Sequence, residues 1–91
     1  MNRRERLYVQ AARAVEAQEQ AAVLKQTGVL RWVADDPDCP DLMRLAAVTE
    51  ETGEVARAVH DGDTDNLSVE LVQLAGVCLA WAAAITPALP V

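Results

Sequence analysis

Apolar residues recur every three or four positions along much of this chain, which is the spacing typical of amphipathic α-helices. Three segments show the pattern: residues 3–25, 41–60 and 65–85. The stretch 28–41 holds two prolines and four aspartates, which favours a loop between the first two segments. We therefore predict an all-α fold, in which the second and third helices form an antiparallel hairpin and the first helix is an addition to it.

Residues at the ends of the segments support these boundaries. Gly28 is suited to end the first helix, and Pro87 cannot continue the third. Pro40 suits the first turn of the second helix. Asp65 or Asn66 is a good N-cap for the third helix, because either side chain accepts a hydrogen bond from a free backbone N–H.

The apolar faces of the helices indicate which sides are buried. The first helix is expected to bury Leu7, Ala11, Ala14, Ala21 and Ala22. The second is expected to bury Leu42, Leu45, Ala46, Thr49, Gly53 and Ala56. The third has one apolar side with Leu67, Leu71, Leu74, Cys78, Trp81 and Ile85, and an opposite apolar side with Val69, Val72 and Leu79. Such a helix is usually central, and one short chain cannot cover both its sides. We therefore predict a helical bundle formed by homo-oligomerisation, as a homodimer or a homotetramer.

Composition narrows the class of protein. The chain has 91 residues, of which 52% are hydrophobic, and its formal net charge is −6. This length favours one domain over residues 1–91. The acidic balance argues against nucleic acid as a partner, because phosphates are held by clustered Lys and Arg. Two distant cysteines, Cys39 and Cys78, are expected to be reduced thiols of a cytoplasmic protein, with Cys78 in the core.

The apolar run over residues 71–91 has no charged side chain, and its length is sufficient to cross a bilayer. Gln73, Pro87 and Pro90 interrupt it, and no basic or aromatic anchor flanks its far end. We therefore expect a buried helix and no membrane partner, and a tail-anchored protein is the less favoured interpretation.

Acidic residues are concentrated on the predicted hairpin. Glu50, Glu51 and Glu54 share a face about 100° wide, at 100° per residue. Glu70 and Gln73 are three residues apart on the third helix and also share a face. In an antiparallel hairpin these faces meet, and four carboxylates repel one another unless a cation or water screens them. Such an oxygen-rich cluster suits Mg²⁺ or Mn²⁺, and an acidic face exposed to solvent is the alternative.

These residues resemble a known family, the MazG-like, all-α nucleoside triphosphate pyrophosphohydrolases. The EExxE and ExxD signatures of that family are similar to residues 50–54 (EETGE) and 70–73 (ELVQ). The resemblance is strongest over residues 42–81 of a single MazG-like helical domain. Gln73 stands where the family pattern has Asp.

The resemblance implies an activity: metal-dependent hydrolysis of a nucleoside triphosphate to the monophosphate and pyrophosphate, with Mg²⁺ or Mn²⁺ as cofactor. It implies that Glu51, Glu54 and Glu70 are metal ligands. Glu50 would orient or deprotonate the attacking water, or complete the metal shell. Gln73 keeps an oxygen able to coordinate a metal but removes one negative charge. The alternative is a non-catalytic interaction or regulatory protein of the same fold, whose metal site has decayed at Gln73.

Further candidates for substrate contacts are Arg57, Lys25, Arg31 and Trp32. Arg57 follows the carboxylates on the same helix, where it either meets a phosphate or pairs with Glu54 or Asp61. Trp32 either stacks on a nucleobase or fills a core or an interface.

Overall fold

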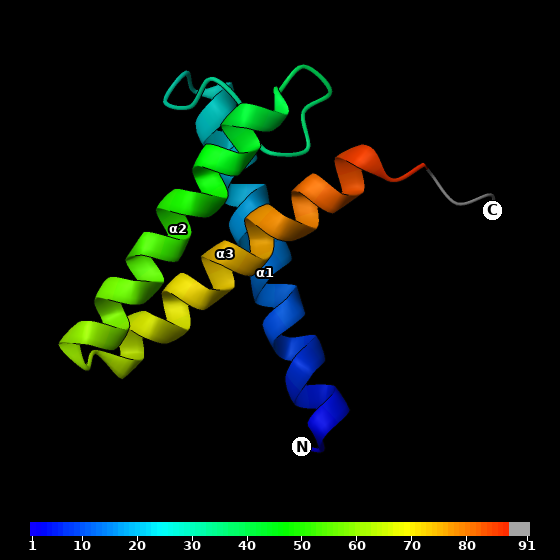
Figure 1. Ribbon diagram of the computed structural model, residues 1–91. Helices are drawn as coiled ribbons and strands as arrows, with labels where there is room; N and C mark the ends of the chain where they lie inside the picture. Colours follow the sequence, from blue (N-terminus) through cyan, green and yellow to red (C-terminus); the bar gives the residue numbers. More distant parts are fainter. Residues whose placement is uncertain (88–91) are drawn as a thin grey trace.

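The structure is a computed structural model that describes residues 1–87. It contains three helices, α1 (Arg3–Gln26), α2 (Asp41–Asp61) and α3 (Thr64–Ile85) (Figure 1). No strand occurs among residues 1–87, so the predicted all-α fold is confirmed. The last four residues of the predicted domain, with Pro90 among them, lie outside the described range.

The first helix begins and ends as its sequence requires. The Asn2 side chain accepts a hydrogen bond from the Glu5 backbone N–H at 2.8 Å, and the Glu5 side chain accepts one from the Asn2 backbone at 3.4 Å. This reciprocal capping satisfies two backbone donors that the first turn leaves free. Gly28 follows the last turn with a φ of +83°, a left-handed conformation that glycine adopts readily.

A tight turn joins α2 to α3. Gly62 takes a left-handed conformation with a φ of +66°, which ends α2. The Asp63 side chain then accepts a hydrogen bond from the Asn66 backbone N–H at 3.1 Å and caps α3. The prediction that Asp65 or Asn66 is the cap was wrong by two or three residues. The reason is that the left-handed glycine completes the reversal early, so that the helix already begins at Thr64.

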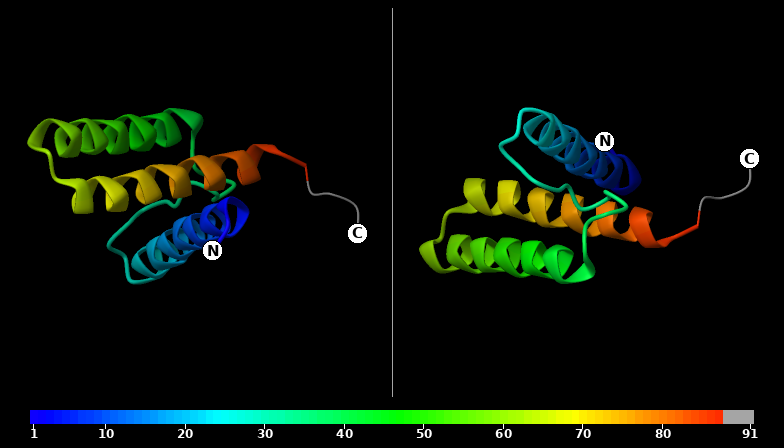
Figure 2. Two further views of the ribbon diagram at one scale, coloured as in Figure 1. Left: turned by 90° about the horizontal axis from the view of Figure 1, so that it is seen from below. Right: turned by 90° about the horizontal axis from the view of Figure 1, so that it is seen from above.

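The helices pack around α3. Helices α2 and α3 run antiparallel side by side, and α1 crosses α3 on its other side (Figures 1 and 2). Within residues 1–87, α1 and α2 each contact α3 and do not contact one another. The central position predicted for the third helix is therefore confirmed. At the crossing, a Cβ atom on Gly76 would lie 2.8 Å from the Ala14 carbonyl oxygen, so this close approach of α1 and α3 requires glycine.

The buried core is small. Among the described residues no large side chain is fully buried, and the buried apolar residues are Ala14, Val33, Cys39, Ala58 and Ala80. Cys78, predicted to lie in the core, is exposed instead, because it lines an open groove between α3 and α1 together with Ala11 and Ala14. Many large apolar side chains remain exposed, among them Leu42 at 78% and Leu45 at 50% of their surface.

The face that α2 buries differs from the prediction. All six positions expected in its core are exposed: Leu42, Leu45, Ala46, Thr49, Gly53 and Ala56. On the opposite face, Arg44 and Ala58 are buried, and Glu51 is partly buried beside Glu70 of α3. The prediction was wrong because hydrophobic periodicity identifies the most apolar face, whereas the turn at Gly62 decides which face meets α3.

Helix α3 is long and apolar enough to cross a membrane by length and composition, a test that ordinary core helices also pass. Only 11% of its most apolar stretch is buried within the single chain. Its exposed apolar side chains include Leu71, Leu79 and Ile85. One copy of the chain therefore leaves much of its central helix uncovered.

Candidate functional site

Two carboxylates meet where α2 packs on α3. Glu51 is partly buried on α2, and Glu70 lies beside it on α3. Burial and the neighbouring Glu70 carboxylate raise the pKa of Glu51 from an ordinary 4.5 to about 7, with smaller contributions from Glu50 and Glu54. The Glu51 Oε2 atom is buried and has no hydrogen-bond partner within residues 1–87. The pair is therefore a partly buried acidic site that forms no salt bridge within residues 1–87.

The other two predicted carboxylates lie less close to this pair. Glu54 is partly buried one turn further along α2, and its charge contributes least to the raised pKa of Glu51. Glu50 is exposed and lines a different hollow. Within residues 1–87, no three His, Cys, Asp or Glu side chains form a group able to hold a metal ion. The predicted convergence of four carboxylates is thus incomplete in the single chain, because Glu50 points about 100° away from Glu51 around the helix.

Gln73 lies toward α1. It is partly buried and lines a groove of about 580 Å³ together with Arg13, Glu16 and Gln20 of α1. Among the described residues its side chain makes no hydrogen bond. Gln73 lies one turn of α3 from Glu70, but Gln73 faces α1, whereas Glu70 lies beside Glu51 of α2.

Three of the predicted site residues surround one hollow. A pocket of about 500 Å³ lies between the 27–40 connection and α2, and its lining includes Arg31, Trp32 and Glu50. The Arg31 guanidinium stacks over the Trp32 ring at 4.4 Å from the ring centroid. The aromatic ring and the guanidinium at this pocket are groups that bind a planar, anionic ligand, whereas the Glu50 carboxylate offers only acceptor oxygens.

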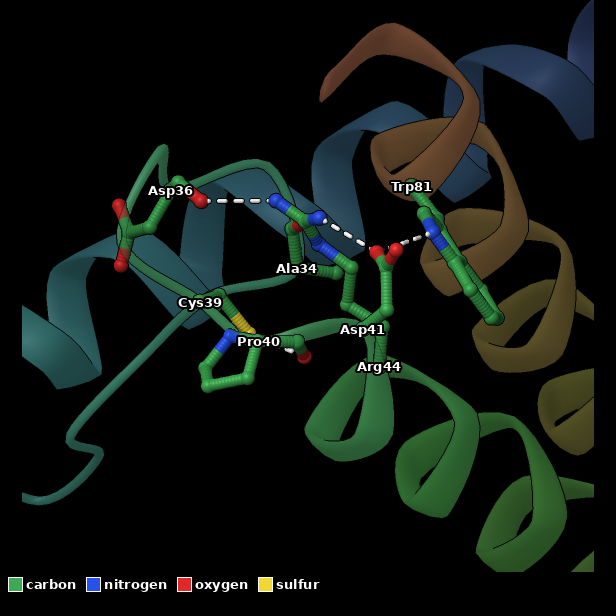
Figure 3. A network of polar contacts seen from close by, with 7 residues as sticks. All are labelled: Ala34, Asp36, Cys39, Pro40, Asp41, Arg44 and Trp81. Carbon is green, nitrogen blue, oxygen red and sulfur yellow. Dashed lines mark hydrogen bonds and ion pairs between the residues drawn. The ribbon is translucent and has the colours of Figure 1, made fainter. Parts of the chain in front are cut away.

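Arg44 is a member of this site that the sequence analysis missed. It is buried, and it hydrogen-bonds to the Ala34 carbonyl at 2.7 Å, the Asp36 carbonyl at 2.8 Å and Asp41 Oδ1 at 2.8 Å (Figure 3). The Trp81 Nε1–H donates to the same Asp41 oxygen at 3.1 Å. The sequence contains no signal for this role, because periodicity predicts that the helix face of Arg44, opposite Leu42 and Leu45, is exposed, and a charged residue is rarely buried.

The remaining two basic candidates have different surroundings. Lys25 Nζ lies 2.7 Å from Asp36 Oδ2, and this hydrogen-bonded pairing lowers the pKa of Asp36 below its ordinary value. Arg57 is exposed on α2 and, within the described part of the chain, pairs with neither Glu54 nor Asp61. Lys25 is thus already engaged with a carboxylate, whereas Arg57 is accessible to a ligand.

Comparison with known proteins identifies the part of the chain that carries these carboxylates. The family model of the MazG nucleotide pyrophosphohydrolase domain matches residues 41–85, which comprise α2 and α3. This match includes Glu50, Glu51, Glu54, Glu70 and Gln73, and it confirms the resemblance found in the sequence. No curated protein and no solved structure matches the chain.

Proposed function

We propose that this protein, whose residues 41–85 belong to the MazG nucleotide pyrophosphohydrolase family, hydrolyses a nucleoside triphosphate to the monophosphate and pyrophosphate in a reaction that depends on Mg²⁺ or Mn²⁺. The observation that carries the proposal is the unpartnered Glu51 Oε2 atom beside Glu70 in the matched hairpin. Two adjacent, partly buried carboxylates repel one another unless a proton or a cation offsets their charge, and hard divalent cations prefer such oxygens.

The residues present fit that cation. Glu51 and Glu70 would hold it, with Glu54 within reach one turn along α2, and the cation when bound would neutralise charge on the phosphates. Gln73 would offer a neutral amide oxygen from the neighbouring turn of α3. Because Gln73 lies toward α1 in the single chain, we expect it to contribute least of these residues to binding the cation.

The proposed reaction needs a water and a group that accepts its proton. The water oxygen bonds to the α-phosphorus, and the bond from that phosphorus to the bridging oxygen breaks, so that pyrophosphate leaves with the bridging oxygen. Glu50 is exposed at the pocket edge, where its carboxylate orients the water and accepts its proton. Glu50 is therefore the proposed catalytic residue. Glu51, Glu54 and Glu70 would hold the cation, which neutralises and positions the phosphates.

The pocket beside Glu50 supports recognition of the nucleotide. Trp32 offers a ring face for a base, and Arg31 above it offers donors for a phosphate. Arg57 is a further exposed donor, and Lys25 contributes only if its pairing with Asp36 opens.

Assembly and location belong to the same proposal. The exposed apolar faces of α2 and α3 are suited to a second copy of the chain, as a homodimer or homotetramer, which would bring further carboxylates to the cluster. We propose a cytoplasmic protein that acts on free nucleotides, without a nucleic-acid or membrane partner. Recovery of the chain in detergent-free buffer tests the last point, since a membrane-spanning α3 would require detergent.

The experiment that tests the function is pyrophosphate release from a panel of standard and modified nucleoside triphosphates, with Mg²⁺, with Mn²⁺ and with a chelator. We expect metal-dependent release, a loss of at least about a hundredfold for Glu50→Gln, and no loss for Glu19→Gln on α1, which lies outside the matched region. Absence of release with every nucleotide would favour the non-catalytic interaction or regulatory protein.

A further inference from the structure

The residue that organises the pocket is buried Arg44. It has 7% of its surface exposed, and all three of its donor nitrogens have partners. Two of these partners are backbone carbonyls of the connection, those of Ala34 and Asp36, and only the third is a side chain. Arg44 therefore ties a segment without regular secondary structure to the first turn of α2.

The tied segment forms one wall of the pocket. Arg31 and Trp32 precede Ala34 by three and two residues, respectively, and Glu50 lies on the α2 side of the same hollow. The segment has a second attachment, because Asp36 accepts a hydrogen bond from the Val33 backbone at 3.0 Å and pairs with Lys25 at the end of α1. Without Arg44, these contacts would still join the segment to α1, but no side-chain hydrogen bond would join it to α2 among the described residues.

Asp41 extends the attachment to α3. Its Oδ1 atom accepts from Arg44 and also from Trp81, a residue 40 positions later in the chain (Figure 3). The connection, the start of α2 and the end of α3 therefore meet at one carboxylate.

We propose that Arg44 is a positioning residue, which holds the connection so that Trp32 and Arg31 face Glu50 across the nucleotide pocket. The inference rests on the proposed function for its effect on turnover. The planar guanidinium reaches three acceptors at fixed angles, whereas the ammonium of lysine cannot bridge the same three oxygens. The positioning role therefore depends on the shape of the Arg44 side chain and not on its charge alone.

The test uses the two tryptophans of the chain, Trp32 and Trp81. In a Trp81→Phe background, Trp32 is the only tryptophan, and acrylamide quenching of its fluorescence reports its exposure. This background lacks the Trp81–Asp41 hydrogen bond in every protein compared, so a difference between them reports on Arg44 alone. We expect Arg44→Lys and Arg44→Met each to raise the quenching constant of Trp32 at least about twofold. Arg6→Lys, an exposed change on α1, is expected to leave it unchanged.

Kinetics of the same substitutions in the otherwise unmodified chain separate positioning from folding. We expect Arg44→Lys to raise KM about tenfold, equivalent to about 1.4 kcal/mol, while kcat stays within about twofold. A merely structural role would instead lower the active fraction, and with it the apparent kcat. Asp41→Ala is the second variant if Arg44→Lys does not fold; Asp41 is itself exposed, and its loss is expected to raise KM in the same direction.

The outcomes are distinguishable. An Arg44→Lys variant with unchanged KM and unchanged Trp32 quenching would overturn the inference, because charge alone would then suffice. Absence of pyrophosphate release from the unmodified chain would overturn the proposed function. In that case the quenching measurement decides on Arg44 by itself, and an unchanged quenching constant overturns its positioning role.

Discussion

Glu51 of α2 lies beside Glu70 of α3, and its Oε2 atom is buried without a hydrogen-bond partner in the described part of the chain. Burial and the neighbouring Glu70 carboxylate together raise the pKa of Glu51 to about 7 in the folded chain. This relationship makes the stability of the metal-free protein depend on pH.

We expect the Tm in the presence of a chelator to fall as the pH rises from about 5 to about 8. Unfolded Glu51 releases its proton near the ordinary pKa of 4.5, whereas the folded residue holds it to about 7, so the folded state loses relative stability across this interval. The lowered pKa of Asp36 acts at lower pH, because its stabilisation is lost only as the pH falls below about 4. Thermal melting of Glu51→Gln is expected to show a flatter dependence; equal slopes in both proteins would contradict this.

Divalent cations are expected to reverse that loss. Mg²⁺ or Mn²⁺ should raise the Tm by several degrees at pH 7.5, because a ligand that binds only the folded state stabilises it. Glu54→Gln and Glu70→Gln should each reduce this increment while leaving the helical circular dichroism intact. If both variants keep the full increment, the carboxylates are an acidic surface without a bound metal.

The chain is expected to be a dimer or a tetramer at micromolar concentration, as measured by light scattering. Leu42 and Leu45 form part of an exposed apolar face on α2, and Val72 and Leu79 extend such a face on α3. Leu45→Glu should shift the protein toward monomer without loss of helix. Val29→Glu, on an exposed residue of the connection, serves as the control and should leave the assembly unchanged. A monomeric unmodified chain would contradict the prediction.

Gln73→Asp tests the position at which the family signature fails. If Gln73 belongs to the metal site, the added carboxylate should lower the Tm in chelator and raise it in Mn²⁺ beyond that of the unmodified chain, with faster turnover. If Gln73 only lines the groove beside Arg13, the Tm of the variant in chelator should be close to that of the unmodified protein. Mn²⁺ should then raise the Tm of both proteins by the same amount. Melting curves with and without Mn²⁺, together with turnover, decide between the two.

Gly76→Ala is expected to destabilise the fold by about 1–3 kcal/mol in urea denaturation. The new methyl group would lie 2.8 Å from the Ala14 carbonyl, and the backbone of α1 would have to move. Gly53→Ala is the matched comparison, because nothing lies within 4 Å of its added methyl group in the single chain. It should be neutral or stabilising by up to about 1 kcal/mol. Equal losses at both positions would contradict the close crossing of α1 and α3.

The sequence by itself determined the helices and the hairpin. Local signals specify these features, since Gly28 and Gly62 adopt left-handed conformations and apolar residues recur at the helical period. The same local pattern placed Glu51 and Glu70 on helices that a short turn must bring together. It also contained the family signature, because that signature is a spacing of side chains along two helices.

Only the tertiary structure decided which helix faces meet. The leucine face of α2 is the more apolar one, yet α2 turns the face with Glu51 and Ala58 toward α3. Periodicity defines a face but not its neighbour, because the neighbour depends on the geometry of the turn and on small residues that permit close packing. For the same reason Arg44 could not be recognised: its partners are carbonyl groups eight and ten residues away, in a connection without a repeating pattern.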